Sequence, residues 1–140
     1  MTKNNLKIIG AMLYVCEGTK ARLDRRYNRL LYSIELTNSD PKIIKIFRLF
    51  LDDIIKIDKK RIHGQLFFYP DLNENKLINF WSKVSSIPRS QFNQSICLKQ
   101  KNGKFKANPL GTFKIRYSCK NDFLKIQKMI DDVWRDARVA

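Results

Sequence analysis

Histidine and cysteine are scarce in this chain of 140 residues, which has one histidine and three cysteines. Cys16, Cys97 and Cys119 are widely spaced and form no Cys-x-x-Cys pair, so neither a disulfide framework nor a zinc site is expected. We expect buried, reduced thiols instead. A hydrolase that uses Cys16 or Ser90 as its nucleophile is not expected either, because neither residue has the partners of a catalytic triad.

The chain also lacks long apolar runs, low-complexity stretches and linkers rich in glycine or proline. The N-terminal apolar run, 6–16, is much shorter than the roughly 20 residues of a membrane span. Glu17 follows it in place of a small-residue cleavage site, so a secretory signal is not expected. We therefore expect one domain, 1–140, in the cytoplasm, or in the nucleus or an organelle of a eukaryotic cell.

Acidic residues are few: 13 aspartates and glutamates face 28 lysines and arginines, which gives a formal net charge of +15. A compact domain with this excess repels itself, and nucleic acid is the commonest polyanion that offsets such repulsion. The alternative is a generally basic proteome, in which surplus lysine serves no particular partner.

Hydrophobic periodicity predicts helices at about 6–17, 41–54, 73–85 and 122–135. Asp40 and Pro41 suit the start of the second helix, and Gly18 suits the end of the first. Period-two runs predict strands near 32–37, 61–68, 95–99 and 112–117, with a short extra strand between 19 and 26. This order indicates an α+β fold whose largely antiparallel sheet carries its helices on one face. Because the first helix is apolar nearly all round, we expect it to pack on its own sheet and on a second subunit.

The other face of the predicted sheet is polar and basic, and it suits contact with base edges. It contains Ser33, Glu35, Thr37, Arg61, His63, Gln65, Phe67, Lys99, Thr112, Lys114 and Arg116. Arg61, Gln65 and Arg116 favour a binding surface over a merely solvated face, since arginine and glutamine make bidentate contacts with bases. We expect Glu35 to pair with a neighbouring cation, although it could read a cytosine or join a metal site. His63 could contact DNA, but a lone strand histidine is more often structural.

Two basic loops extend this face. Arg22, Arg25, Arg26 and Arg29 surround Tyr27 in the first loop, and Lys99, Lys101, Lys104 and Lys106 surround Asn102-Gly103 in the second. Asn-Gly between two strands is a hairpin signal. Such loops could bind phosphates on either side of a segment that the sheet reads, or could simply be solvated.

The segment GAMLYVCEG, 10–18, resembles the nine-residue LAGLIDADG motif in Ala11, Leu13, Glu17 and Gly18. Later blocks resemble the same superfamily in the same order: ELTNSDP at 35–41, FW at 80–81, IPRSQF at 87–92 and LGTFKI at 110–115. The chain is thus similar to single-motif LAGLIDADG homing endonucleases over nearly its whole length. Met12, Tyr14 and Val15 depart from the motif, and Val15 stands where active members often have an acid.

This resemblance implies a saddle-shaped sheet that straddles duplex DNA and a homodimer in which the motif helices pack together. It also implies Mg²⁺ or another divalent metal at the paired copies of Glu17, beside Gly18. Gly10, Ala11 and Tyr14 would lie at the dimer interface, because Gly10, Tyr14 and Glu17 share one helical stripe. Lys114 and Arg116 are candidates for the basic residues that assist cleavage. Carboxylates near a dimer axis would hold the metal, which activates water and stabilises the leaving oxygen.

The sequence therefore predicts a site-specific endonuclease of double-stranded DNA that acts as a homodimer. One alternative is a DNA-binding regulator with the same fold that has lost cleavage. Another is an intron RNA maturase or RNA-binding protein, in which Tyr27 or Phe67 would stack on unpaired bases. The last is a basic interaction module with no nucleic-acid partner.

Overall fold

The computed structural model describes residues 1–99 and 108–139, which form four α-helices, six strands and two short helical turns. In chain order they are α1 Lys3–Glu17, β1 Arg22–Asp24, β2 Arg29–Leu31, β3 Ser33–Asn38, α2 Pro41–Phe50, the π-helical turn Leu51–Ile55, β4 Ile62–Phe68, α3 Glu74–Ser85, the 3₁₀ turn Arg89–Gln91, β5 Ile96–Cys97, β6 Thr112–Ser118 and α4 Lys120–Asp136.

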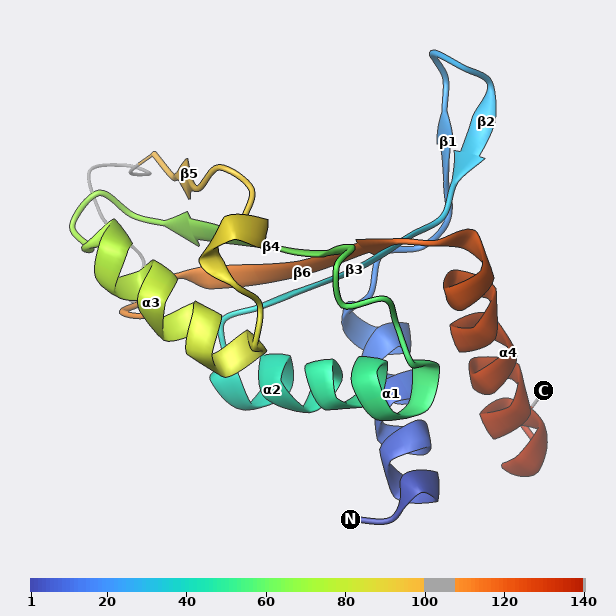
Figure 1. Ribbon diagram of the computed structural model, residues 1–140. Helices are drawn as coiled ribbons and strands as arrows, with labels where there is room; N and C mark the ends of the chain where they lie inside the picture. The colour runs from blue at the N-terminus through green and yellow to red at the C-terminus, as the bar shows by residue number, and fades with distance from the viewer. Residues whose placement is uncertain (100–107, 140) are drawn as a thin grey trace.

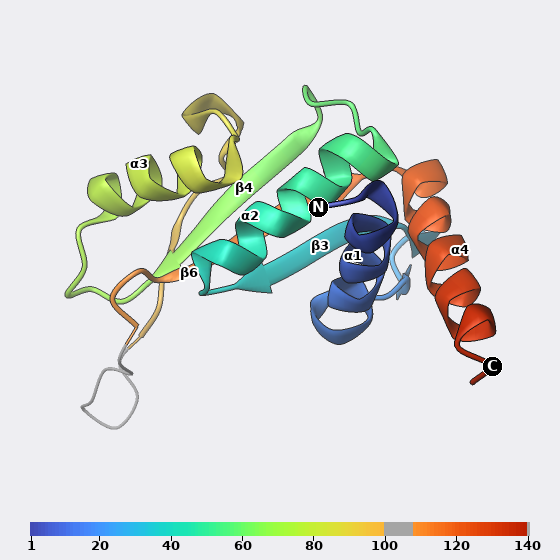
Figure 2. The same cartoon turned by 90° about the horizontal axis from the view of Figure 1, so that it is seen from below.

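Four strands form the main sheet in the order β3-β6-β4-β5. The pairs β3/β6 and β6/β4 are antiparallel, and the two-residue strand β5 runs parallel to β4. The helices lie on one side of this sheet, and the β1-β2 hairpin projects away from them (Figures 1 and 2). The predicted α+β class is confirmed.

The predicted hairpin turn at Asn102-Gly103 lies outside the described residues. Strand β4 lies between β5 and β6, so the strands on either side of Asn102-Gly103 are not neighbours in the sheet. The two lysines of this loop that were predicted to bind DNA, Lys101 and Lys104, lie outside the described residues. Lys99 is described and is exposed just after β5.

Local signals place the helix ends well. The Asp40 carboxylate accepts a hydrogen bond from the Lys42 amide at 2.9 Å, and Pro41 is the first residue of α2, as predicted. Asn73 caps α3 in the same way, through the Lys76 amide at 3.1 Å. These caps satisfy amides that the first helical turn leaves without a partner.

The core lies between the helices and the inner face of the sheet. The Trp81 ring stacks on Phe113 of β6 with ring centroids 5.2 Å apart, and its indole N–H donates to the Leu110 carbonyl at 2.7 Å. Tyr14 of α1 stacks on Phe47 of α2 at 6.0 Å. These contacts join helices α1, α2 and α3 to one apolar layer.

The side of α1 predicted to face a second subunit faces the core of its own chain. Gly10, Ala11 and Tyr14 are buried, and a Cβ added at Gly10 would lie 2.0 Å from a ring carbon of Phe50. Their assignment to a dimer interface is therefore wrong. Helical periodicity predicts two stripes on α1 but does not say which of them packs against α2. In the structure, the Gly10 stripe packs against the Phe50 ring of α2.

The opposite stripe of α1 is the one that remains open. It consists of Ile8, Ile9, Met12 and Cys16. Ile8 is 40% exposed and Cys16 is exposed, whereas Ile9 and Met12 are half-buried and Met12 packs against the core at its edge. The expectation of buried thiols is likewise wrong, because Cys97 is exposed as well and Cys119 is half-buried. All three are free cysteines. No helix in the described part of the chain has the length and apolar character needed to cross a membrane.

Candidate nucleic-acid interface

The outward side chains of β4 and β6 form paired rows on the open face of the sheet. His63 lies opposite Arg116, and Gln65 lies opposite Lys114, while Ile62 and Tyr117 beside them point inward and are buried. The predicted outward orientation of His63, Gln65, Phe67, Thr112, Lys114 and Arg116 is confirmed by the alternating burial of both strands, and Arg61, just before β4, is exposed. One buried face and one open face explain why period two predicted these strands correctly.

Several of these side chains already have partners within the chain. The His63 ring Nδ1 lies 3.1 Å from the Gln91 carbonyl, and the Gln65 amide donates to the Gln94 carbonyl at 2.9 Å. Arg61 donates to the Ser118 carbonyl and lies over the Tyr117 ring. The segment 91–94, which begins at the last residue of the 3₁₀ turn, therefore borders the face and orients its polar groups.

Strand β3 differs from the prediction. Ser33 and Glu35 are buried rather than exposed, and Thr37 is half-buried. Ser33 lies opposite Ser118, with their hydroxyl oxygens 3.4 Å apart, so it is a poor candidate for direct DNA contact. Period two predicted which way these residues point but not that other side chains cover them.

Three cations cover Glu35. Its carboxylate is 4% exposed and lies 3.5 Å from Arg22, 3.6 Å from Arg116 and 3.9 Å from Lys114. Those cations remain 52%, 46% and 27% exposed. The expected pairing of Glu35 with neighbouring cations is confirmed, and the cluster keeps a net positive charge at the surface. Proximity in sequence gives no sign that Arg22, on the hairpin, reaches this carboxylate.

Two adjoining hollows open on the same face. The first has a volume of about 440 Å³ and the second about 320 Å³. Arg61, Arg116 and Ser118 line both of them. Lys60, His63 and Asn93 complete the first, and the second adds Arg22, Arg29, Leu30, Leu31, Tyr32, Ser33, Cys119 and Lys120. No acidic residue is among these described linings, so both hollows favour anions.

The β1-β2 hairpin extends the basic surface beyond the sheet. The short strand predicted between 19 and 26 is confirmed as β1, and its partner β2 was not predicted. Tyr27 at the tip is 66% exposed, with Arg26 and Arg29 at 5.7 and 5.2 Å from its ring centroid. Arg22 and Arg25 are exposed on the same hairpin. A basic tip around an exposed aromatic ring can bind phosphates and stack on a base.

The C-terminal end of α1 lies against β3. Gly18 forms a bridge with Leu36, and the Thr19 amide donates to the Glu35 carbonyl at 2.9 Å. Glu17 is exposed at this end. Gly18 ends α1 with a φ of −80°, so backbone freedom does not require glycine there. An added Cβ would instead lie 2.4 Å from the ring of Tyr14.

Tyr14 and Lys20 hold this helix end in place. The Tyr14 hydroxyl donates to the Thr19 carbonyl, and burial raises its pKa to about 12. The Lys20 ammonium donates to the carbonyls of Tyr14, Val15 and Gly18 at 3.2, 2.9 and 3.4 Å. A cation at a helix C-terminus stabilises the last carbonyls. Sequence reasoning missed Lys20, although a lysine just after a helix end is a known capping signal.

The exposed Glu17 carboxylate is a donor type that a hard divalent cation such as Mg²⁺ prefers. The Gly18 carbonyl, the second predicted ligand, already accepts a hydrogen bond from the Lys20 ammonium at 3.4 Å. Within the described part of one chain, no three His, Cys, Asp or Glu side chains gather as a metal-ligand group. Comparison of this chain with models of known protein families, with curated proteins and with solved structures finds no match.

Proposed function

We propose that this protein is a site-specific endonuclease of double-stranded DNA that acts as a homodimer, binds its target on the open face of the sheet and holds a divalent metal at Glu17 of each chain. The two adjoining cation-lined hollows carry this proposal, because they gather positive charge on the one sheet face that the helices leave open. The resemblance of 10–18 to the LAGLIDADG motif supplies the catalytic part.

Affinity would come from phosphates and specificity from base edges. Arg61 and Arg116 line both hollows and can make bidentate contacts. The second hollow alone has five cationic residues: Arg22, Arg29, Arg61, Arg116 and Lys120. Five phosphate contacts imply a log–log salt slope of about −4.5, so a fourfold increase in salt should weaken binding roughly 500-fold.

Cleavage would take place where α1 meets the sheet. Glu17 would hold the metal, which when bound polarises a phosphate oxygen and lowers the pKa of bound water. The Gly18 carbonyl would become a second ligand only once Lys20 releases it. Lys114 and Arg116, on the neighbouring strand, would neutralise charge on the phosphate that they bind. Two chains would associate through the open stripe of α1, Ile8, Ile9, Met12 and Cys16, which replaces the stripe predicted from the sequence.

The decisive experiment is a cleavage assay on a randomised duplex library, with Mg²⁺ and with chelator, for wild type, Glu17→Gln and Glu74→Gln. Glu74 is an exposed carboxylate at the start of α3, so its variant is a control for the same change of charge. We expect metal-dependent cutting at one site by wild type and Glu74→Gln, and binding without cutting by Glu17→Gln. Equal cutting by all three proteins would exclude Glu17 as a ligand.

Other outcomes select among the alternatives. Specific binding without cutting by any variant would indicate a regulator, and a lack of binding to any nucleic acid would remove the whole proposal. The exposed Tyr27 ring between Arg26 and Arg29 favours RNA binding as the second candidate. Competition between structured RNA and duplex DNA decides between the DNA and RNA candidates. An RNA-binding protein or maturase would be favoured if RNA at equal concentration displaces the duplex from wild type but not from Tyr27→Ala.

A further inference from the structure

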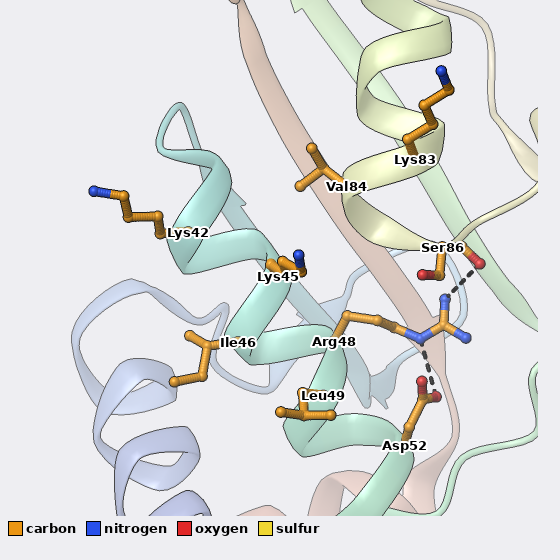
Figure 3. A pocket seen from close by; sticks show the side chains of 9 residues that line it. All are labelled: Lys42, Lys45, Ile46, Arg48, Leu49, Asp52, Lys83, Val84 and Ser86. Atoms are coloured by element: carbon orange, nitrogen blue, oxygen red, sulfur yellow. Dashed lines mark hydrogen bonds and ion pairs between the residues drawn. The ribbon is translucent and has the colours of Figure 1, made fainter. Parts of the chain in front are cut away.

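A groove of about 400 Å³ lies between α2 and α3, on the helix side of the sheet (Figure 3). It is separate from the basic hollows, which open on the other face. Its lining combines an apolar floor with a basic rim. The residues are Lys42, Lys45, Ile46, Arg48, Leu49, Asp52, Lys83, Val84 and Ser86.

The floor consists of aliphatic side chains from both helices. Ile46 and Leu49 project from α2 and Val84 from α3 (Figure 3). Leu49 is 45% exposed, although α2 buries Phe47 and Phe50 on its other side. Ile46 and Val84 are half-buried and pack against the core, so Leu49 is the exposed apolar side chain of the lining. An apolar side chain of a partner could cover it.

The rim is positive. Lys42 and Lys45 are exposed on α2, and Lys83 is exposed on the last turn of α3. None of these three lysines takes part in the ion pairs found within the described residues. Asp52 is the acidic residue of the lining, and Arg48 neutralises it at 3.0 Å. The three lysines therefore set the charge that an approaching ligand meets.

Arg48 makes the groove a preformed site. Its buried guanidinium donates to Asp52 on the α2 side, and to the Ser85 and Ser86 carbonyls at 2.9 and 3.1 Å on the α3 side. These bonds fix the spacing between the two helices before any ligand binds. A rigid site loses less conformational entropy on binding than one that must be ordered.

We propose that this groove docks an acidic amphipathic segment of a partner protein. Two or three apolar side chains of that segment would cover Leu49 and its neighbours, while its carboxylates pair with the lysine rim. The lining has no aromatic side chain on which a base could stack, and a nucleic acid would leave the aliphatic floor exposed. Docking here leaves the open sheet face free and does not depend on the proposed endonuclease function.

The test uses a capped peptide of about four helical turns, with leucine at every third or fourth position and glutamate elsewhere. Binding to the full chain is followed by amide chemical shifts and by fluorescence anisotropy. We expect shifts at Ile46, Leu49 and Val84, with a Kd on the order of 10 to 100 µM for so small a surface. A matched peptide with lysine in place of glutamate should not bind.

Two charge-reversal triples provide the control. Lys42→Glu/Lys45→Glu/Lys83→Glu should weaken binding of the acidic peptide roughly tenfold or more and should create binding of the basic peptide. The matched triple reverses Lys3, Lys76 and Lys128, which are exposed elsewhere, and should bind like wild type. Leu49→Ser, at an exposed position, tests the apolar part without loss of core packing and should also weaken binding.

Three results would overturn the proposal. The first is equal loss of binding in both triples, which would mean that only net charge matters. The second is the absence of peptide-induced shifts at the groove, or their appearance on the sheet face instead. The third is that wild type binds phosphatidylserine vesicles but not the peptide, and that vesicle binding is lost in the triple at Lys42, Lys45 and Lys83. The groove would then contact a membrane.

Discussion

Replacement of Glu35 by glutamine removes one negative charge where three cations converge and barely changes the shape of the side chain. Removal of one partner from a fully buried ion pair costs about 3–5 kcal/mol, whereas an exposed pair contributes about 0.2–1 kcal/mol. Glu35 is buried, but two of its three partners are about half exposed, so solvent screens much of the resulting repulsion. We therefore expect the free energy of unfolding to fall by about 2 kcal/mol.

The same change should strengthen nonspecific binding to DNA. Arg22, Lys114 and Arg116 would no longer share their charge with a carboxylate 3.5–3.9 Å away. If one further phosphate is bound, the log–log salt slope should become steeper by about 0.9. Specificity should fall, because the cations lose the anchor that fixes their positions.

Urea denaturation followed by circular dichroism measures the first effect, and salt titration with a fixed nonspecific duplex measures the second. The control is Glu74→Gln, which makes the same change of charge on an exposed helix turn and should alter neither quantity appreciably. Unchanged stability together with weaker DNA binding at every salt concentration would refute the reasoning. In that case, Glu35 would neither be stabilised by the cations nor compete with phosphate for them.

Two further predictions concern the packing beneath this face. Gly10→Ala should destabilise the fold by about 1–3 kcal/mol, because the new Cβ would lie 2.0 Å from a Phe50 ring carbon. Ile8→Ala, at a position that is 40% exposed on the same helix, should cost less in the same urea titration. Alkaline pH should unfold the protein, because burial raises the pKa of both Tyr14 and Tyr117 to about 12. The stabilisation that these raised pKa values add to the free energy of unfolding is complete below pH 10. It falls by about 1.4 kcal/mol for each group and each pH unit between pH 10 and pH 12. The free energy of unfolding, followed by fluorescence as a function of pH, should fall less steeply in Tyr14→Phe than in wild type. Equal pH slopes for the two proteins would contradict the prediction.

The sequence predicted elements whose signals are local. Asp40 was predicted as a cap and caps α2 through an amide two residues away, and the helix predicted from about 73 begins just after Asn73, which caps it. The outward rows of β4 and β6 were predicted correctly because each strand buries one face and leaves the other open. The alternation of side chains along a strand is enough to predict which residues point inward and which point outward.

The parts that the sequence did not predict depend on contacts between distant segments. Ser33 and Glu35 follow the expected alternation, yet they are buried because Arg22, Arg116 and Ser118 reach them from other elements. Similarly, the pairing of β5 with β4 rather than β6 depends on the three-dimensional path of the chain and not on its turn residues. Nothing in the composition of 95–99 distinguishes these two partners.

The position of Glu17 on α1 bears on how a dimer would use it. Glu17 follows Gly10 and Tyr14 at helical spacing, and both of those residues face the core of their own chain. The helical spacing therefore places the Glu17 side chain on the side of α1 that faces its own core, while Ile8 and Cys16 are exposed on the other side. Two helices that meet through that other side would direct their Glu17 carboxylates apart. Under the proposed function, a metal at Glu17 of each chain would then fit better than one metal shared on the axis.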